Sequence, residues 1–400
     1  MTYEITSLND QGLGICYVNN KITFVKNAVI NDIVTIKIIK EFSKYNIAIV
    51  DKYIKYSNKR INSKCPYFEK CGGCILQNLK YEDTLKFKKD KLESILHKFA
   101  NINTDVKIVS NANDYNYRNK VSLKVVNKVI GYYSYNSNDI VKIDRCEIAS
   151  KAINKVILKL EKFNIINGDI TIRSNYKNEI LIIINSSDDI NIDNIDNIDN
   201  IDNVVGIIKN KKVVYGQDYF IDKIGNKLFK VSYDSFFQVN NYIIEKIFDD
   251  INKYILKNSN VLDLYCGVGT LGINVSNTSN KIVGIEYIEN AINNAKENAL
   301  INNLKKYEYY LGDVSNVILK IKDNIDVIIC DPPRSGLNKK TIESILNINP
   351  KQIIYVSCDP ITLSRDLKVL LNNYKIDYIK GYDMFSYTYH LETLVVLNKK

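Results

Sequence analysis

The chain has 400 residues, which is more than one ordinary domain needs, so we expect two or three domains. It contains no run of about eighteen apolar residues and no basic-then-apolar N-terminal signal, so we expect a cytoplasmic protein that binds no membrane. We also expect a monomer. The net charge is +10, and the first 100 residues hold 17 Lys and Arg against 10 Asp and Glu. This excess favours a polyanionic partner, although a merely soluble surface would also explain it.

Short stretches of alternating polarity fill residues 1–58 and are separated by Asn, Asp and Gly, which predicts the strands of a small OB-like barrel. The stretch resembles the TRAM domain, an RNA-binding module, in Gly12-Leu13-Gly14-Ile15, Phe24-Val25 and Asn31-Asp32-Ile33-Val34. Asn31 stands where that family has Gly. The alternative to an RNA-binding barrel is a structural cap. The predicted strands are 14–18, 22–25, 33–38 and 47–50.

Three of the eight cysteines, Cys65, Cys71 and Cys74, lie within ten residues, and Cys146 follows far downstream. A cytoplasmic chain does not favour a disulfide framework, whereas Gly72-Gly73 allows the tight turn that a metal site needs. Four sulfur ligands suit either zinc or an iron–sulfur cluster, and the spacing does not separate the two. Packed free thiols are the remaining alternative.

Residues 59–240 are predicted to form a central, β-rich domain. Apolar residues at helical spacing predict a helix over 80–100, which we place either there or against the C-terminal domain. The segment 115–120 interleaves Tyr, Arg and Lys, so it either stacks on RNA bases or forms a strand with a solvated face. Residues 192–203 are four copies of Ile-Asp-Asn, and we interpret 188–203 as a low-complexity insertion without chemistry.

Residues 241–400 alternate apolar strands with helical patterns, which predicts a parallel, doubly wound α/β sheet of Rossmann-like type. Polar residues follow the strands, where such sheets bind ligands. They include a glycine-rich turn at 267–272, Glu286, Asp313, the rigid turn Asp331-Pro332-Pro333-Arg334 and Cys358. The glycine-rich turn alone also fits an NAD(P)-dependent iron–sulfur oxidoreductase.

The motif order resembles the RNA uracil-5-methyltransferases, and with the barrel and cysteines it is similar to the branch that acts on 23S ribosomal RNA. The motifs are Phe236-Phe237-Gln238-Val239-Asn240, Asp263-Leu264-Tyr265-Cys266-Gly267, Asp331-Pro332-Pro333-Arg334, Ser357-Cys358-Asp359-Pro360 and His390-Leu391-Glu392-Thr393. The resemblance implies S-adenosylmethionine and a [4Fe–4S] cluster as cofactors and large-subunit ribosomal RNA as the partner.

The same resemblance implies a role for each matching residue. Cys358 would be the nucleophile and Glu392 the proton acceptor. The methyl-donor site would comprise Gln238, Tyr265, Thr270, Glu286, Asp313 and Asp331, and the cluster would be held by Cys65, Cys71, Cys74 and Cys146. A thiolate is needed because uracil C5 is a poor nucleophile until a group adds at C6, and a base must then remove the C5 proton. A transfer RNA substrate and a non-catalytic RNA-binding protein are the alternatives.

Overall fold

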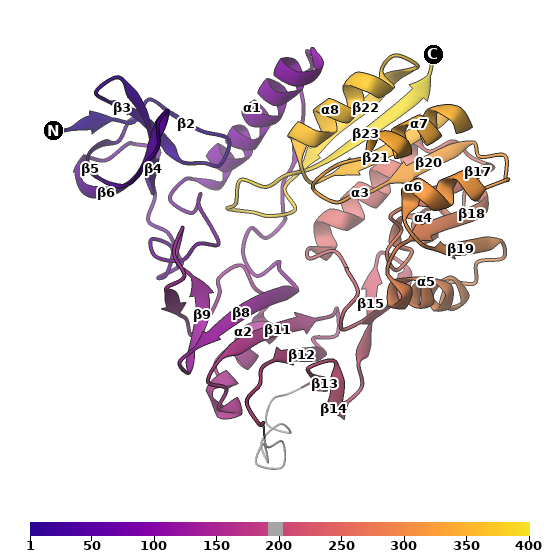
Figure 1. Cartoon of the computed structure of the whole chain (residues 1–400), viewed down its shortest axis with the longest axis horizontal. Coiled ribbons are helices and arrows are strands. Elements are labelled where there is room, and N and C mark those ends of the chain that lie inside the picture. The colour runs from indigo at the N-terminus through magenta and orange to yellow at the C-terminus, as the bar shows by residue number, and fades with distance from the viewer. Residues whose placement is uncertain (191–202) are drawn as a thin grey trace.

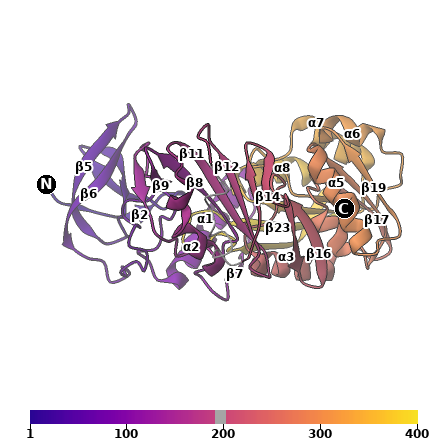
Figure 2. The ribbon, with the colours of Figure 1, turned by 90° about the horizontal axis from the view of Figure 1, so that it is seen from below.

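The computed structural model describes residues 1–190 and 203–400, so nearly all of the Ile-Asp-Asn repeat lies outside the described residues. Three sheets and one separate hairpin make up the strands of this part (Figures 1 and 2). Within these ranges, no helix is both long and apolar enough to cross a membrane.

The N-terminal sheet closes on itself. Its edge strands, β1 and β2, are separated in the chain only by Ile5 and Thr6, so the first and last strands of the sheet must lie together. Asn31 has a φ of 70°, a left-handed conformation that Asn tolerates, which explains why it can occupy a glycine position. The strands, in sheet order, are β1 (Tyr3–Glu4), β5 (Ile33–Glu41), β6 (Tyr45–Lys55), β4 (Lys21–Lys26), β3 (Gly14–Val18) and β2 (Ser7–Leu8).

The central sheet has seven strands in the described residues, and the short helix α2 (Lys151–Ile157) covers one face. Ile153 of this helix is fully buried against Leu123 and Ile170 of the sheet. The strands, in sheet order, are β10 (Ile140–Lys142), β9 (Val129–Tyr133), β8 (Lys120–Val126), β11 (Gly168–Ser174), β12 (Ile180–Asn185), β13 (Val204–Lys209) and β14 (Lys212–Gly216).

The C-terminal sheet is the predicted doubly wound sheet. Its first five strands are parallel, and β23 is inserted antiparallel between β21 and β22. Val261 and Leu262 point to opposite hydrophobic cores, so helices cover both faces. The strands, in sheet order, are β19 (Tyr307–Leu311), β18 (Ser279–Glu286), β17 (Ser259–Leu264), β20 (Val327–Cys330), β21 (Gln352–Ser357), β23 (Glu392–Lys399), β22 (Tyr374–Tyr382) and β7 (Ile108–Val109).

Segments that precede residue 241 also pack against the C-terminal sheet or its helices. The helix predicted at 80–100 is α1 (Tyr81–Ala100), and it packs on α8 (Pro360–Leu370). Strand β7 extends the sheet by pairing with β22, and the hairpin of β15 (Tyr219–Ile224) and β16 (Lys227–Ser232) packs on α5 (Glu289–Ile301). The remaining helices are α3 (Asn241–Tyr254), α4 (Thr270–Val275), α6 (Val314–Val317), α7 (Lys339–Ile348), η1 (Leu160–Phe163) and η2 (Ile318–Lys320).

Candidate active site

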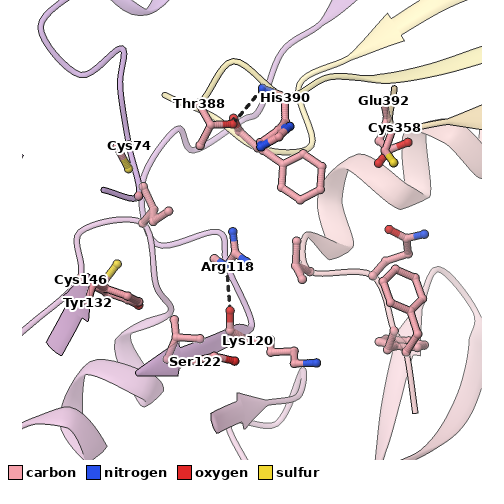
Figure 3. A pocket seen from close by; sticks show the side chains of 18 of the residues that line it. Cys74, Arg118, Lys120, Ser122, Tyr132, Cys146, Cys358, Thr388, His390 and Glu392 are labelled. Carbon is pink, nitrogen blue, oxygen red and sulfur yellow. Dashed lines mark hydrogen bonds between the residues drawn. The ribbon is translucent and has the colours of Figure 1, made fainter. Parts of the chain in front are cut away.

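One cavity of about 1000 Å³ joins the central sheet, the segment that precedes α3 and the carboxyl ends of the C-terminal strands. Figure 3 shows two groups of side chains around it, with Cys74 and Cys146 on one side and Cys358 and Glu392 on the other. Every predicted site residue except Thr270 and Asp313 lines this cavity.

Cys358 lies between the end of β21 and the start of α8. Asp359 caps this helix by accepting hydrogen bonds from the backbone N–H groups of Ile361 and Thr362, at 3.0 and 2.9 Å, so the turn is fixed beside the thiol. Burial raises the pKa of Cys358 to about 12, and Glu392 and Asp331 add to the shift through their negative charges. The free protein therefore holds Cys358 as a thiol at neutral pH.

Glu392 is brought to Cys358 by strand register. Ser357 of β21 is opposite Thr393 of the antiparallel strand β23, so the next residues in each direction, Cys358 and Glu392, are neighbours. Their side chains lie together in Figure 3. Glu392 is 6% exposed, and its Oε2 atom has no hydrogen-bond partner among the residues that the structure describes. Burial raises the pKa of Glu392 well above its usual value, and Asp331 raises it further.

Asp331 directly follows β20 and faces the same space. Gln238 donates a hydrogen bond from Nε2 to its Oδ2 atom, at 3.3 Å, which ties the segment before α3 to the Pro-Pro turn. Burial raises the pKa of Asp331 to about 7. At the far end of this turn, Arg334 Nη2 lies 3.5 Å from His390 Nε2, and both side chains border the cavity.

The glycine-rich turn after β17 forms another wall. Glu286, at the end of β18, accepts hydrogen bonds from the backbone N–H groups of Gly267, at 3.0 Å, and Tyr287, at 2.7 Å. Gly267 has a φ of 55°, and a Cβ atom there would point into open space. Tyr265 also adopts a left-handed φ, 62°, which is costly for a bulky residue and marks a constrained site. This wall leaves the backbone open to a bound ligand.

Thr270 and Asp313 lie outside the cavity lining. Thr270 is the first residue of α4, and Asp313 caps α6 by accepting a hydrogen bond from the Ser315 backbone N–H group, at 2.9 Å. Both residues therefore lie at the starts of helices.

The four predicted cluster ligands line the opposite end of the cavity. In all six pairs of Cys65, Cys71, Cys74 and Cys146, one thiol affects the pKa of the other, so these side chains gather in one region. The four sulfur donors suit an iron–sulfur cluster chemically. Among the described residues, however, no group of three or more His, Cys, Asp or Glu is arranged to hold a metal ion.

Several cavity residues were not among the individually predicted site residues. Arg118 donates a hydrogen bond from Nε to the Lys120 carbonyl, at 2.8 Å, and both residues face the cavity (Figure 3). The alternation of Tyr, Arg and Lys in 115–120 was the available signal. The His390 backbone N–H group donates to Thr388 Oγ1, at 3.2 Å, which holds the loop before Glu392.

Comparison with known proteins identifies the family. The family model described as tRNA (Uracil-5-)-methyltransferase matches residues 80–309 and 314–400. The chain belongs to the RNA uracil-5-methyltransferase family. An uncharacterized RNA methyltransferase of Caldanaerobacter subterraneus subsp. tengcongensis is 32% identical over 100% of this chain and 98% of its own length. A Clostridium tetani relative, also described as an uncharacterized RNA methyltransferase, is 34% identical over 98% and 95%.

A solved structure resembles this RNA methyltransferase over its whole length. It is the tRNA (uracil-54, C5)-methyltransferase of Pyrococcus abyssi in complex with S-adenosyl-L-homocysteine. The two chains are 25% identical, the TM-score is 0.83, and the match covers 99% of this chain and 100% of the other. The predicted α/β methyltransferase fold is confirmed. The family also explains the glycine-rich turn, so the alternative of an NAD(P)-dependent iron–sulfur oxidoreductase is not needed.

Proposed function

We propose that this methyltransferase transfers a methyl group to C5 of a specific uridine in RNA. The observation that carries the proposal is the side-by-side placement of Cys358 and Glu392 at the end of two paired strands, in a cavity wide enough for a base and a nucleoside donor. A target inside an RNA helix would have to leave its stack to reach the thiol.

Cys358 acts as the nucleophile. Its thiol loses a proton to the solvent that reaches it, and the sulfur adds to uracil C6. The electrons of the C5–C6 double bond then form an enolate with the C4 carbonyl, which makes C5 nucleophilic. Arg334 favours the thiolate because its positive charge lowers the pKa of Cys358. The region around the sulfur is only half-buried, which leaves the access that a nucleotide needs.

Glu392 acts as the base that completes the reaction. After methylation, C5 carries both a proton and a methyl group. Glu392 removes that proton, the C5–C6 double bond reforms, and the Cys358 sulfur leaves. The Oε2 atom suits this task, because no donor from residues 1–190 or 203–400 competes for its lone pairs. Its raised pKa makes the ionised carboxylate a strong base.

S-Adenosylmethionine, the donor that we assign to the cavity, supplies an electrophilic methyl group when it is bound. Glu286 would take the ribose hydroxyls, Tyr265 and Asp331 would line the adjoining wall, and Gln238 would hold Asp331 in place. The open Cβ position of Gly267 supports this assignment. The Pyrococcus abyssi protein binds S-adenosyl-L-homocysteine, which is the demethylated donor. Thr270 and Asp313 would complete the site from α4 and α6.

We propose large-subunit ribosomal RNA as the substrate and transfer RNA as the second candidate. The first assignment rests on the resemblance of the barrel and the cysteine spacing. The second is favoured by the Pyrococcus abyssi protein, because a tRNA methyltransferase is similar to this chain over the barrel as well. The N-terminal domain at 1–58 would act as the TRAM-type RNA-binding module in either case, beside a central domain at 59–240 and a catalytic domain at 241–400.

The positions of 5-methyluridine in cellular RNA test this assignment. In cells that lack the gene, mass mapping should show one or more 5-methyluridine positions lost from 23S ribosomal RNA, and the wild-type gene should restore them. Loss from transfer RNA alone would overturn the ribosomal assignment. Complementation with the Cys358→Ala gene should fail, whereas Cys16→Ala, which removes a thiol from the barrel core, should restore methylation.

A further inference from the structure

A second cavity of about 650 Å³ lies between the barrel, α1, the turn at 135–136 and the start of α8. It shares Arg334, Cys358 and His390 with the larger cavity, so the two spaces meet at the nucleophile. The proposed uridine and methyl donor occupy the larger cavity. The smaller one has no part in the reaction described above.

Four Phe and Tyr side chains and the His390 ring line this second cavity, and all of them are half-buried. The Tyr389 and His390 rings lie 4.1 Å apart between centroids. Lys91 Nζ lies 5.1 Å from the Tyr389 ring and donates a hydrogen bond to the Tyr389 carbonyl, at 3.0 Å. Lys26 Nζ lies 5.0 Å from the Tyr135 ring. Two of the aromatic rings are thus held by cations. The four residues are Phe24, Tyr45, Tyr135 and Tyr389.

The polar groups of the cavity favour a base over a phosphate. The positive charges of Lys91 and Arg334 are balanced there by the negative charges of Asp10 and Asp359. A phosphate would meet two carboxylates, whereas an uncharged base meets aromatic faces for stacking. Side-chain amides, which can donate and accept at a base edge, are supplied by Asn9, Gln11 and Asn136.

We propose that this cavity binds the base of an unpaired nucleotide that adjoins the methylated uridine, with Tyr135 as a stacking surface. The inference rests on the proposed function, because the neighbouring uridine must lie at Cys358. The shared boundary at Arg334, Cys358 and His390 allows one RNA strand to place consecutive bases in the two cavities. The barrel then contributes to the choice of RNA sequence as well as to affinity.

The test uses the full chain and short RNA hairpins that contain the mapped uridine. In each hairpin, one nucleotide that flanks the uridine is replaced by an abasic one. Removing the stacked base should weaken binding to the wild-type protein at least about fivefold. Tyr135→Leu should weaken binding of the intact RNA by a similar factor and should be insensitive to the abasic change. Tyr135→Phe keeps the ring and should bind as the wild type does.

Tyr17→Leu is the matched control, because this barrel tyrosine is 58% exposed and does not line the cavity. It should leave RNA affinity unchanged, and S-adenosylmethionine affinity should be the same in all variants. The subsite is wrong if Tyr135→Leu binds intact RNA as the wild type does, or if it loses further affinity with every abasic RNA. If the wild type transfers no methyl group to the intact hairpin, the proposed function itself fails.

Discussion

Cys358 and Glu392 each disfavour the charge of the other, because both become negative when they lose a proton. Burial raises the pKa of both groups, and Asp331 adds a third negative charge to the same space. This balance of charges favours the protonated form of both groups. Arg334 is the positive charge that opposes this trend at both groups.

The effect of Glu392 on the thiol is directly measurable. In Glu392→Gln, the nearby negative charge is gone, so we predict that the pKa of Cys358 falls. The pH midpoint of Cys358 alkylation by iodoacetamide, followed by peptide mass spectrometry, should therefore move to lower pH. Glu297→Gln changes an exposed carboxylate on α5 and should leave the midpoint in place. An unchanged midpoint in Glu392→Gln would contradict the electrostatic coupling.

The same variant should trap the reaction part-way. Without a carboxylate to remove the C5 proton, the methylated uracil stays bonded to the Cys358 sulfur. We predict a protein–RNA adduct that survives a denaturing gel and is absent from the double variant with Cys358→Ala. Rapid turnover by Glu392→Gln with no adduct would remove Glu392 from the role of base.

The rate of methyl transfer should rise with pH. The burial that raises the pKa of Cys358 to about 12 and that of Glu392 above its usual value disfavours the two ionised forms that the reaction requires. Raising the pH populates both forms. Single-turnover rates measured from about pH 6 to about pH 9 should increase throughout. A rate that falls over this range would show that a protonated group limits the reaction instead.

Asp263 should make the fold less stable as pH rises. Burial raises its pKa to about 7, above the value of about 3.9 in an unfolded chain. A raised folded-state pKa gives a stabilising contribution that is complete below about pH 4 and is lost as pH rises through about 7. Asp263→Asn removes this dependence. The urea midpoint of this variant, relative to wild type, should therefore be higher at about pH 8 than at about pH 5.

At the scale of elements, a buried polar network fixes the loop that carries the site. Lys88 of α1 pairs with Asp383 and donates a hydrogen bond to the Phe385 carbonyl, at 2.9 Å, and the side chains of the pair are fully buried. Asn111 donates from Nδ2 to the Asp383 carbonyl, at 2.7 Å, and Asn240 donates to Asn111 Oδ1, at 2.8 Å. Helix α1 thereby positions the segment between β22 and Glu392.

Breaking this pair should loosen α1 more than changing a surface pair. In Lys88→Met, Asp383 stays buried without its cation, so we predict a loss of about 3 to 5 kcal/mol in local stability. Hydrogen exchange of α1 and of residues 383–391 should rise together. Lys86→Met breaks an exposed pair with Asp90 on the same helix. The local opening free energy derived from hydrogen exchange should change by less than about 1 kcal/mol in this variant. Equal effects of the two variants would contradict the positioning role.

The sequence predicts elements best where their pattern is local. Helix α1 and the parallel strands follow from apolar spacing, because each buries one stripe or both faces. The pairing of β7 with β22 involves only two residues of each strand, and these strands are far apart in the sequence. No periodic pattern in the sequence therefore predicts this pairing. The insertion of β23 beside β21 is equally non-local, and it creates the contact between Cys358 and Glu392. From the sequence, only the family resemblance predicts that Cys358 and Glu392 belong to one site.

At the scale of the whole molecule, the chain leaves the C-terminal sheet after β7, forms the central sheet and returns through β15 and β16 (Figure 1). The cysteine region and the reaction site therefore lie at two ends of one cavity. The cysteine spacing predicted four ligands, and the fold gathers them. Among the described residues, however, these thiols are not arranged to hold a metal ion.

We propose that a [4Fe–4S] cluster closes this site and joins residues 65–74 to Cys146. Protein purified without oxygen should contain about four iron atoms per chain and absorb broadly in the visible range. Cys146→Ser should lose iron, whereas Cys16→Ser, which changes the barrel thiol, should retain it. Stoichiometric zinc without iron in the wild type would show that the site binds zinc instead. If the purified protein contains neither iron nor zinc, the four cysteines are free thiols.

In the proposed reaction, a proton leaves C5 of a uridine each time a methyl group arrives. RNA transcribed with [5-³H]uridine and incubated with S-adenosylmethionine tests it most directly, with 23S ribosomal RNA fragments and transfer RNA as separate substrates. We predict tritium release to water in equal amount to the methyl groups incorporated, and no release by Cys358→Ala. Methyl incorporation without tritium release, or full release by Cys358→Ala, would contradict it.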